Sequence, residues 1–124
     1  MFSKKKILMG LALVSLFSTV SASATTYLSK SLNGTNSESS YVALGSGKRY
    51  LKATATNLSG TAYAMKIVPW APDKSMTSVT VSNPNSASSS FNSVATTDDG
   101  ETQSYYLKWK GSSSKASADL SFTD

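Results

Sequence analysis

Apolar and polar residues alternate along residues 102–122, and a period of two is typical of half-buried β-strands. One face of the first half carries the large residues Tyr105, Leu107 and Trp109. One face of the second half carries the smaller set Ala116, Ala118, Leu120 and Phe122. The segment that joins the two halves, residues 111–114, is short and polar. The sequence therefore predicts that the two strands pair as a hairpin and carry much of the core.

Short alternating runs separated by turn residues fill the rest of the chain after residue 24, and helical spacing is nearly absent. Further strands are expected at residues 25–32, 41–44, 49–57, 61–68, 76–82 and 91–96. Residues 83–90 are rich in serine and contain a proline, so we expect a loop there. The pattern predicts an all-β, single-domain antiparallel β-sandwich of about seven or eight short strands over residues 25–124.

Residues 1–24 have the composition of a signal peptide. Three lysines precede an apolar run at residues 7–17, and the sequence Ala-Ser-Ala follows as a cleavage site. The run is shorter than the roughly 20 residues of a membrane span. We therefore expect a bacterial type of leader that is cleaved after Ala24, and a secreted protein without a transmembrane anchor.

The charge and the missing residue types restrict the function. Twelve Lys and Arg face seven Asp and Glu, for a net charge of +5, but three lysines lie in the leader, so the exported part retains only +2. A balance this small gives no reason to expect nucleic-acid binding. The chain has no His and no Cys, which excludes a Ser-His-Asp triad, an imidazole or thiolate metal site and a thiolate nucleophile. No cofactor motif is present, and we expect a protein that is not an enzyme.

Two groups of polar residues are candidate sites. The alternation places a set of tyrosines and lysines on outer strand faces, where they could contact wall polymer, a membrane surface or a secreted protein. This set is Tyr50, Lys52, Lys66, Tyr106, Lys108 and Lys110. The second group, Asp98, Asp99 and Glu101, surrounds a glycine and could hold calcium, although an ordinary solvated turn explains it as well. Both alternatives, binding surface and solvated strand face, stay open for the first group.

Trp70 lies between Pro69 and Pro72, in a segment that must end a strand because proline cannot donate to a sheet. A loop tryptophan of this kind either closes the end of the core or forms an exposed contact. We expect it to close the core.

The run Ser-Tyr-Tyr-Leu-Lys-Trp at residues 104–109 resembles the C-terminal end of the lactococcin-type β-sandwich bacteriocins. The resemblance implies a secreted toxin that interferes with cell-wall synthesis in related bacteria. This chain continues beyond the run and lacks histidine, in which it departs from that family. The leading expectation is a small secreted, non-enzymatic binding protein that acts at a cell surface or in the extracellular medium, and the alternative is a bacteriocin-like toxin.

Overall fold

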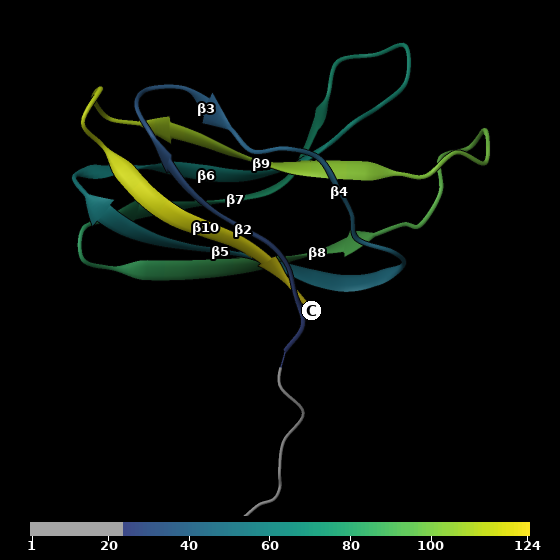
Figure 1. Ribbon diagram of the computed structural model, residues 1–124, viewed down its shortest axis with the longest axis horizontal. Coiled ribbons are helices and arrows are strands. Elements are labelled where there is room, and N and C mark those ends of the chain that lie inside the picture. Colours follow the sequence, from purple (N-terminus) through teal and green to yellow (C-terminus); the bar gives the residue numbers. More distant parts are fainter. Residues whose placement is uncertain (1–23) are drawn as a thin grey trace, which may run out of the picture.

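The computed structural model describes residues 24–124, which form two packed antiparallel β-sheets (Figure 1). The strands are β2 (Thr26–Asn33), β3 (Ser37–Glu38), β4 (Val42–Ala43), β5 (Gly47–Asn57), β6 (Ser59–Lys66), β7 (Lys74–Ser82), β8 (Ser86–Ser93), β9 (Ser104–Gly111) and β10 (Ser117–Thr123). The prediction of an all-β sandwich is confirmed. Apart from Ala24, the expected leader lies outside the described residues. In the part of the chain that the structure describes, no helix is long and apolar enough to cross a membrane.

The two sheets form the two layers of the sandwich. The four-stranded sheet has the order β2-β10-β5-β8, and the five-stranded sheet has the order β3-β9-β6-β7, with β4 also paired to β9. Strands β9 and β10 are therefore interior strands, each with partners on both sides. Antiparallel sheets with one buried face carry an alternation of apolar and polar residues, which is the pattern of this sequence.

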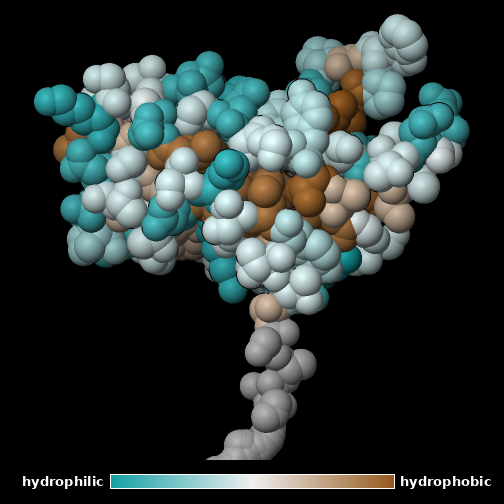
Figure 2. Space-filling model, in the orientation of Figure 1, coloured by the Kyte–Doolittle hydropathy of each residue, from teal (hydrophilic) through white to brown (hydrophobic). Residues whose placement is uncertain are grey.

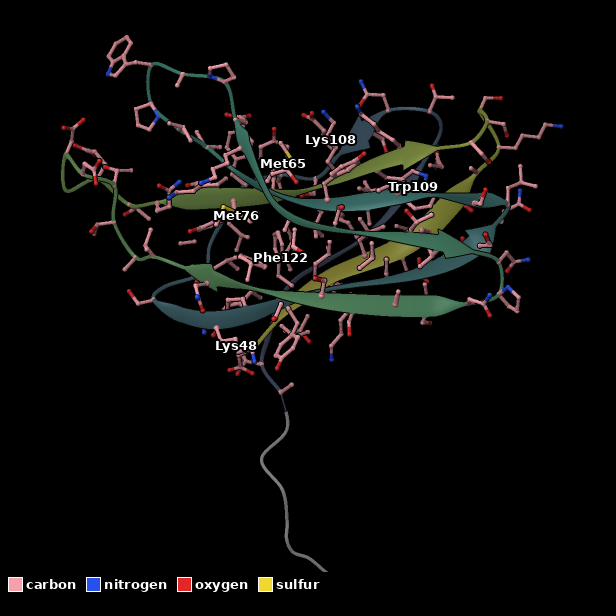
Figure 3. All side chains as sticks on the ribbon, turned by 180° about the vertical axis from the view of Figure 1, so that it is seen from behind. Lys48, Met65, Met76, Lys108, Trp109 and Phe122 are labelled. Carbon is pink, nitrogen blue, oxygen red and sulfur yellow. The ribbon has the colours of Figure 1, made fainter. Side chains whose placement is uncertain are left out.

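The core follows the faces that the alternation predicts. Tyr105, Leu107 and Trp109 of β9 are completely buried, and so is Phe122 of β10. Phe91 of β8 contacts both layers, with ring centroids 5.9 Å from Tyr105 and 5.8 Å from Phe122. Figure 3 shows Phe122 between the two sheets and Lys108 on the outer side of one of them. The predicted inward faces of β9 and β10 are confirmed.

The predicted hairpin of residues 102–122 is wrong. Strand β9 pairs with β3, β4 and β6, whereas β10 pairs with β2 and β5 in the other sheet. The link between them is an arch that crosses from one sheet to the other and is held by backbone hydrogen bonds to Gly34. Large residues on β9 face small ones on β10 across the sandwich, which satisfies the same packing without direct strand pairing.

The serine-rich stretch at residues 83–90 is mostly strand, which corrects the expected loop. Strand β8 begins at Ser86 and pairs along β5, from Ser86 opposite Thr54 to Ser93 opposite Gly47. The hydroxyl groups of Ser86 and Thr54 lie 2.7 Å apart, within hydrogen-bonding distance. Pairing with the long strand β5 outweighs the weak β-propensity of serine. The strand ends at Ser93, so residues 94–96 belong to the next loop instead of a strand.

Two very short strands raise the number of strands to nine within residues 24–124. Strands β3 and β4 pair with β9 on either side of Ser39, a buried serine that fills the break between them. The Ser39 hydroxyl accepts a hydrogen bond from the backbone N–H of Leu107 at 2.8 Å. This side-chain bond replaces a ladder bond, so the edge of the five-stranded sheet stays satisfied.

Candidate functional site

The structure does not bring the six predicted binding residues together on one surface. Tyr50 and Lys52 lie on the outer face of the four-stranded sheet, and Tyr106, Lys108 and Lys110 lie on β9 in the opposite sheet. Lys66 is the last residue of β6 and pairs with the inward-facing Tyr105, so it does not belong to an outer face. Ala62 and Ala64 form the buried face of β6, so the outer face was assigned to the wrong residues of this strand. Alternation also does not say to which sheet a strand belongs.

Tyr106 is on the outer side of its sheet as predicted, but it is only 4% exposed. The link between β3 and β4 crosses over it, with the Tyr41 ring centroid 5.5 Å from that of Tyr106. The Tyr106 hydroxyl donates a hydrogen bond to Asp73 Oδ2 at 2.6 Å. Tyr106 therefore does not offer a free binding surface, and instead it holds the segment that precedes β7.

Burial raises the pKa of the Tyr106 phenol above its ordinary value, and the hydrogen bond to Asp73 and the charge of that carboxylate raise it further. The unfolded chain loses this proton near pH 10, while the folded protein keeps it to higher pH. The stabilisation is therefore complete below about pH 10 and is lost as the pH rises toward the raised pKa.

We expect Tyr106→Phe to lower the free energy of unfolding by about 1 kcal/mol at neutral pH, because it removes one hydrogen bond to the exposed residue Asp73. The variant should also lose part of the decline in stability above about pH 10. Urea unfolding at several pH values would measure both effects. An identical alkaline decline in the two proteins would show that Tyr106 does not titrate in this way.

Lys108 and Lys110 border a shallow hollow of about 130 Å³ on the outer face of the five-stranded sheet. Its other lining residues are Tyr63, Met65 and Ser75. Lys110 Nζ lies 5.7 Å from the centre of the Tyr63 ring, at cation–π distance. Figure 3 places Lys108 and Met65 together on this side, with Lys48 on the opposite side of the molecule. The hollow is small and open, so a solvated strand face explains it.

A larger cleft lies at one end of the sandwich, between the loop that joins β6 to β7 and the loop that joins β8 to β9. Both loops project beyond the sheets at the right of Figure 1. The cleft has a volume of about 370 Å³. Its apolar lining is Val68, Pro69, Trp70 and Val94, and its polar lining includes Lys66, Asp98 and Asp99. We call it the loop-end cleft. Figure 2 shows hydrophobic residues at the base of the β6–β7 loop and also across the middle of the drawn face, which is otherwise hydrophilic or neutral.

Trp70 is completely exposed, with a relative accessibility of 101%, which corrects the expectation that it closes the core. Its φ is 61°, and the N–H of Ala71 approaches the carbonyl of Val68 at 3.4 Å. Pro69 at the second position and a positive φ at the third are features of a type II turn, in which glycine normally takes the third position. A non-glycine residue in this conformation costs about 1–2 kcal/mol.

Two hydrogen bonds fix the ends of the Trp70 loop to the rest of the fold. The buried Gln103 side chain donates from Nε2 to the Ile67 carbonyl at 2.7 Å, where the loop begins. Tyr106 bonds to Asp73, where the loop ends. The backbone N–H of Gln103 donates to the carbonyl of Ala95, so the same residue also braces the second loop. Nothing in the sequence pattern marked Gln103 for this position.

The acidic loop on the other side of the cleft is also ordered by its own hydrogen bonds. Thr97 N–H donates to the Glu101 carbonyl at 2.8 Å, and Gly100 N–H donates to the Thr97 carbonyl at 3.0 Å. Asp98 and Asp99 line the cleft. Among residues 24–124 no group of three His, Cys, Asp or Glu side chains could hold a metal ion, so the structure adds no support for calcium at Asp98, Asp99 and Glu101.

Comparisons of the chain with protein-family models, with curated proteins and with solved structures found no match. The run at residues 104–109 that resembles lactococcin-type bacteriocins is the start of β9, and four of its six residues are buried. The run therefore contributes to the core, and this burial explains its aromatic content.

Proposed function

We propose that the protein is a secreted, non-enzymatic binding module that acts at a cell surface or in the extracellular medium, and that it binds its ligand in the loop-end cleft. The observation that carries the proposal is Trp70, which is completely exposed in a backbone conformation that disfavours it. The sequence drew attention to the strand faces, but the candidate binding surface that the geometry favours lies on the loops.

Trp70 has no role in stabilising the fold that could explain its position. Its side chain is fully accessible and so buries no apolar surface against the rest of the chain. A glycine would occupy the turn with less strain. Backbone outliers of this kind cluster at ligand sites, and exposed aromatic side chains are frequent anchors of binding surfaces. The two features together favour a role in binding.

The composition of the cleft favours binding over catalysis. The chain lacks His and Cys, so any catalysis would have to use carboxylates, lysine, tyrosine or serine. Glycoside hydrolysis generally needs two carboxylates that flank the bond to be cleaved. Asp98 and Asp99 are adjacent residues on one loop, and the other side of the cleft supplies Lys66 and apolar side chains but no carboxylate. This arrangement provides contacts to a ligand but no opposed acid and base.

The matched variants Trp70→Gly and Leu58→Gly test the proposal. Leu58 is a suitable control because it is also exposed, at 46%, and also has a positive φ, of 59°. Leu58 precedes β6 and Trp70 follows this strand, so the two residues lie near its opposite ends. Both substitutions should leave the free energy of unfolding unchanged or raise it by up to about 1 kcal/mol, because glycine relieves the strained backbone.

Purified protein would be incubated with cell-wall and membrane fractions of bacteria and then sedimented. We expect the unchanged protein and Leu58→Gly to be retained on at least one fraction, and Trp70→Gly to be retained about tenfold less. Equal retention of all three proteins would rule out the loop-end cleft as the binding site. Absence of retention on every fraction, at low as well as high salt, would contradict the role at a cell surface.

A further inference from the structure

We infer that the loop-end cleft recognises carbohydrate, with Trp70 packed on the face of a sugar ring and Asp98 and Asp99 accepting hydrogen bonds from its hydroxyl groups. The inference rests on the proposed function and adds the chemical class of the ligand. The volume of about 370 Å³ lies within the roughly 300–1,000 Å³ of small-ligand sites.

The apolar side of the cleft suits the C–H face of a pyranose. Trp70 presents a large flat ring, and none of its surface is covered by the chain. Pro69, Val68 and Val94 extend this apolar surface into the cleft. Contact with the weakly polar face of a sugar would remove part of this surface from water, which is favourable at roughly 25 cal/mol per Å². Trp70 would contribute this contact area at a low cost in conformational entropy, because its side chain has few rotatable bonds.

The polar side of the cleft suits the hydroxyl groups at the edge of the same ring. Asp98 and Asp99 are exposed carboxylates that act as hydrogen-bond acceptors, and Thr96 and Thr97 offer hydroxyl groups that both donate and accept. Lys66 adds a donor from the end of β6. A hydrogen bond from a hydroxyl group to a carboxylate is stronger than a hydrogen bond between two neutral groups. A ligand with one apolar face and several hydroxyl groups matches both sides of the cleft.

The charges of the cleft make other ligand classes less suitable. Two carboxylates against one lysine repel a phosphate polymer or an anionic lipid surface. A cationic ligand would be attracted by the carboxylates and by the Trp70 ring, but it would also be repelled by Lys66. An uncharged polyhydroxyl ligand avoids both conflicts. The main alternative to a sugar is thus a cationic ligand. The affinity of a cationic ligand would fall with added salt and with the loss of carboxylate charge, whereas the affinity of a sugar would depend little on salt.

Gln103 and Tyr106 act as positioning residues for this site. They hold the two ends of the Trp70 loop through hydrogen bonds of 2.7 Å and 2.6 Å. A loop that is already fixed loses less conformational entropy when the ligand binds, which increases affinity. Tyr106, predicted as a surface contact, thus contributes to the site from beneath the loop.

The test is a titration of the purified protein with soluble oligosaccharides of glucose, galactose, mannose and N-acetylglucosamine, followed by tryptophan fluorescence. Trp109 is completely buried, so a change in emission on binding should come mainly from Trp70. We expect at least one oligosaccharide to bind with an affinity that hardly changes up to about 1 M salt, where the Debye length falls to ~3 Å.

The variant Asp98→Asn with Asp99→Asn should weaken this binding by about tenfold, because each amide is a weaker acceptor than a carboxylate. Asp119→Asn is the control, since Asp119 lies on β10 and its carboxylate accepts a hydrogen bond from Ser31 away from the cleft. It should bind like the unchanged protein. Equal binding by the double variant would overturn the assignment of Asp98 and Asp99.

Two further outcomes separate the ligand class from the proposed function. Failure of the whole oligosaccharide panel, with Trp70-dependent retention on cell fractions intact, would overturn carbohydrate as the ligand and leave the binding module in place. Trp70-dependent binding to polylysine-coated beads that disappears at about 1 M salt would identify a cationic ligand instead. If neither oligosaccharides nor any cell fraction bind, the proposed function fails together with this inference.

Discussion

Replacement of Trp109 by alanine is expected to lower the free energy of unfolding by about 3–5 kcal/mol, the range for large aromatic residues in a core. Trp109 is completely buried on β9, opposite Ser37 of β3 and Ala62 of β6. Alanine would remove the apolar surface of the indole from the core and leave a cavity that the two sheets cannot fill without moving. Urea unfolding followed by circular dichroism would measure the change.

Trp109→Phe separates the loss of volume from the loss of the indole N–H. Trp109 Nε1 is buried and has no hydrogen-bond partner among the described residues, so phenylalanine breaks no such bond. The loss should therefore be smaller, about 1–2 kcal/mol, and come from the smaller ring alone. A loss below about 0.5 kcal/mol for Trp109→Ala, typical of surface positions, would contradict the inward orientation of β9.

The alternation of the sequence predicted inner and outer faces well because burial acts on each residue separately. Tyr50 and Lys52 of β5 were expected on an outer face, and the residues that alternate with them, Leu51, Ala53 and Ala55, are all buried. The same holds for Tyr105, Leu107 and Trp109 on β9. A period of two in which one face must leave water favours one orientation of each strand. Strand β6 is an exception, because the small residues Ala62 and Ala64 form its buried face and Lys66, expected outside, lies on that face.

Strand partners could not be predicted in the same way, because alternation carries no information about which strand lies alongside. Residues 102–122 would satisfy their pattern as a hairpin or as two strands in opposite sheets. Both arrangements bring large residues against small ones. The choice depends on contacts with distant strands, such as β5 with β10 and β6 with β9, which are separated by many residues in sequence.

The loop-end cleft had only a partial signal in the sequence. Pro69 and Pro72 indicated a turn around Trp70, but a turn does not determine whether its side chain points toward the core or toward water. Asp98 and Asp99 stood out as an acidic cluster, while the Trp70 loop that faces them across the cleft lies far away in sequence. The covering of Tyr106 by Tyr41 could not be predicted for the same reason, because it depends on the link between β3 and β4 crossing over β9 in the folded protein.

The arch between β9 and β10 explains the second large effect, which we expect at Gly111. A Cβ at this position would collide with the Gly34 carbonyl oxygen and would lie 2.7 Å from Ala116 Cβ. The Gly34 carbonyl cannot easily move away, because two hydrogen bonds hold this residue in place. Its carbonyl accepts from the Gly111 N–H at 3.0 Å, and its N–H donates to the Ala116 carbonyl at 2.9 Å. Gly111→Ala should therefore cost about 3 kcal/mol, at the upper end of the usual range for overpacking.

Gly100→Ala is the matched control for Gly111→Ala. Gly100 has a φ of 83° and no atom within 4 Å of an added Cβ, so alanine there meets only the backbone penalty of about 1 kcal/mol. Gly111 lacks a positive φ, so its penalty is steric. A larger loss for Gly111→Ala in thermal or urea unfolding would support the close crossing of the chain at Gly34. Equal losses would mean that the arch has room for a side chain, and the two sheets would then be joined less tightly at this end than the structure indicates.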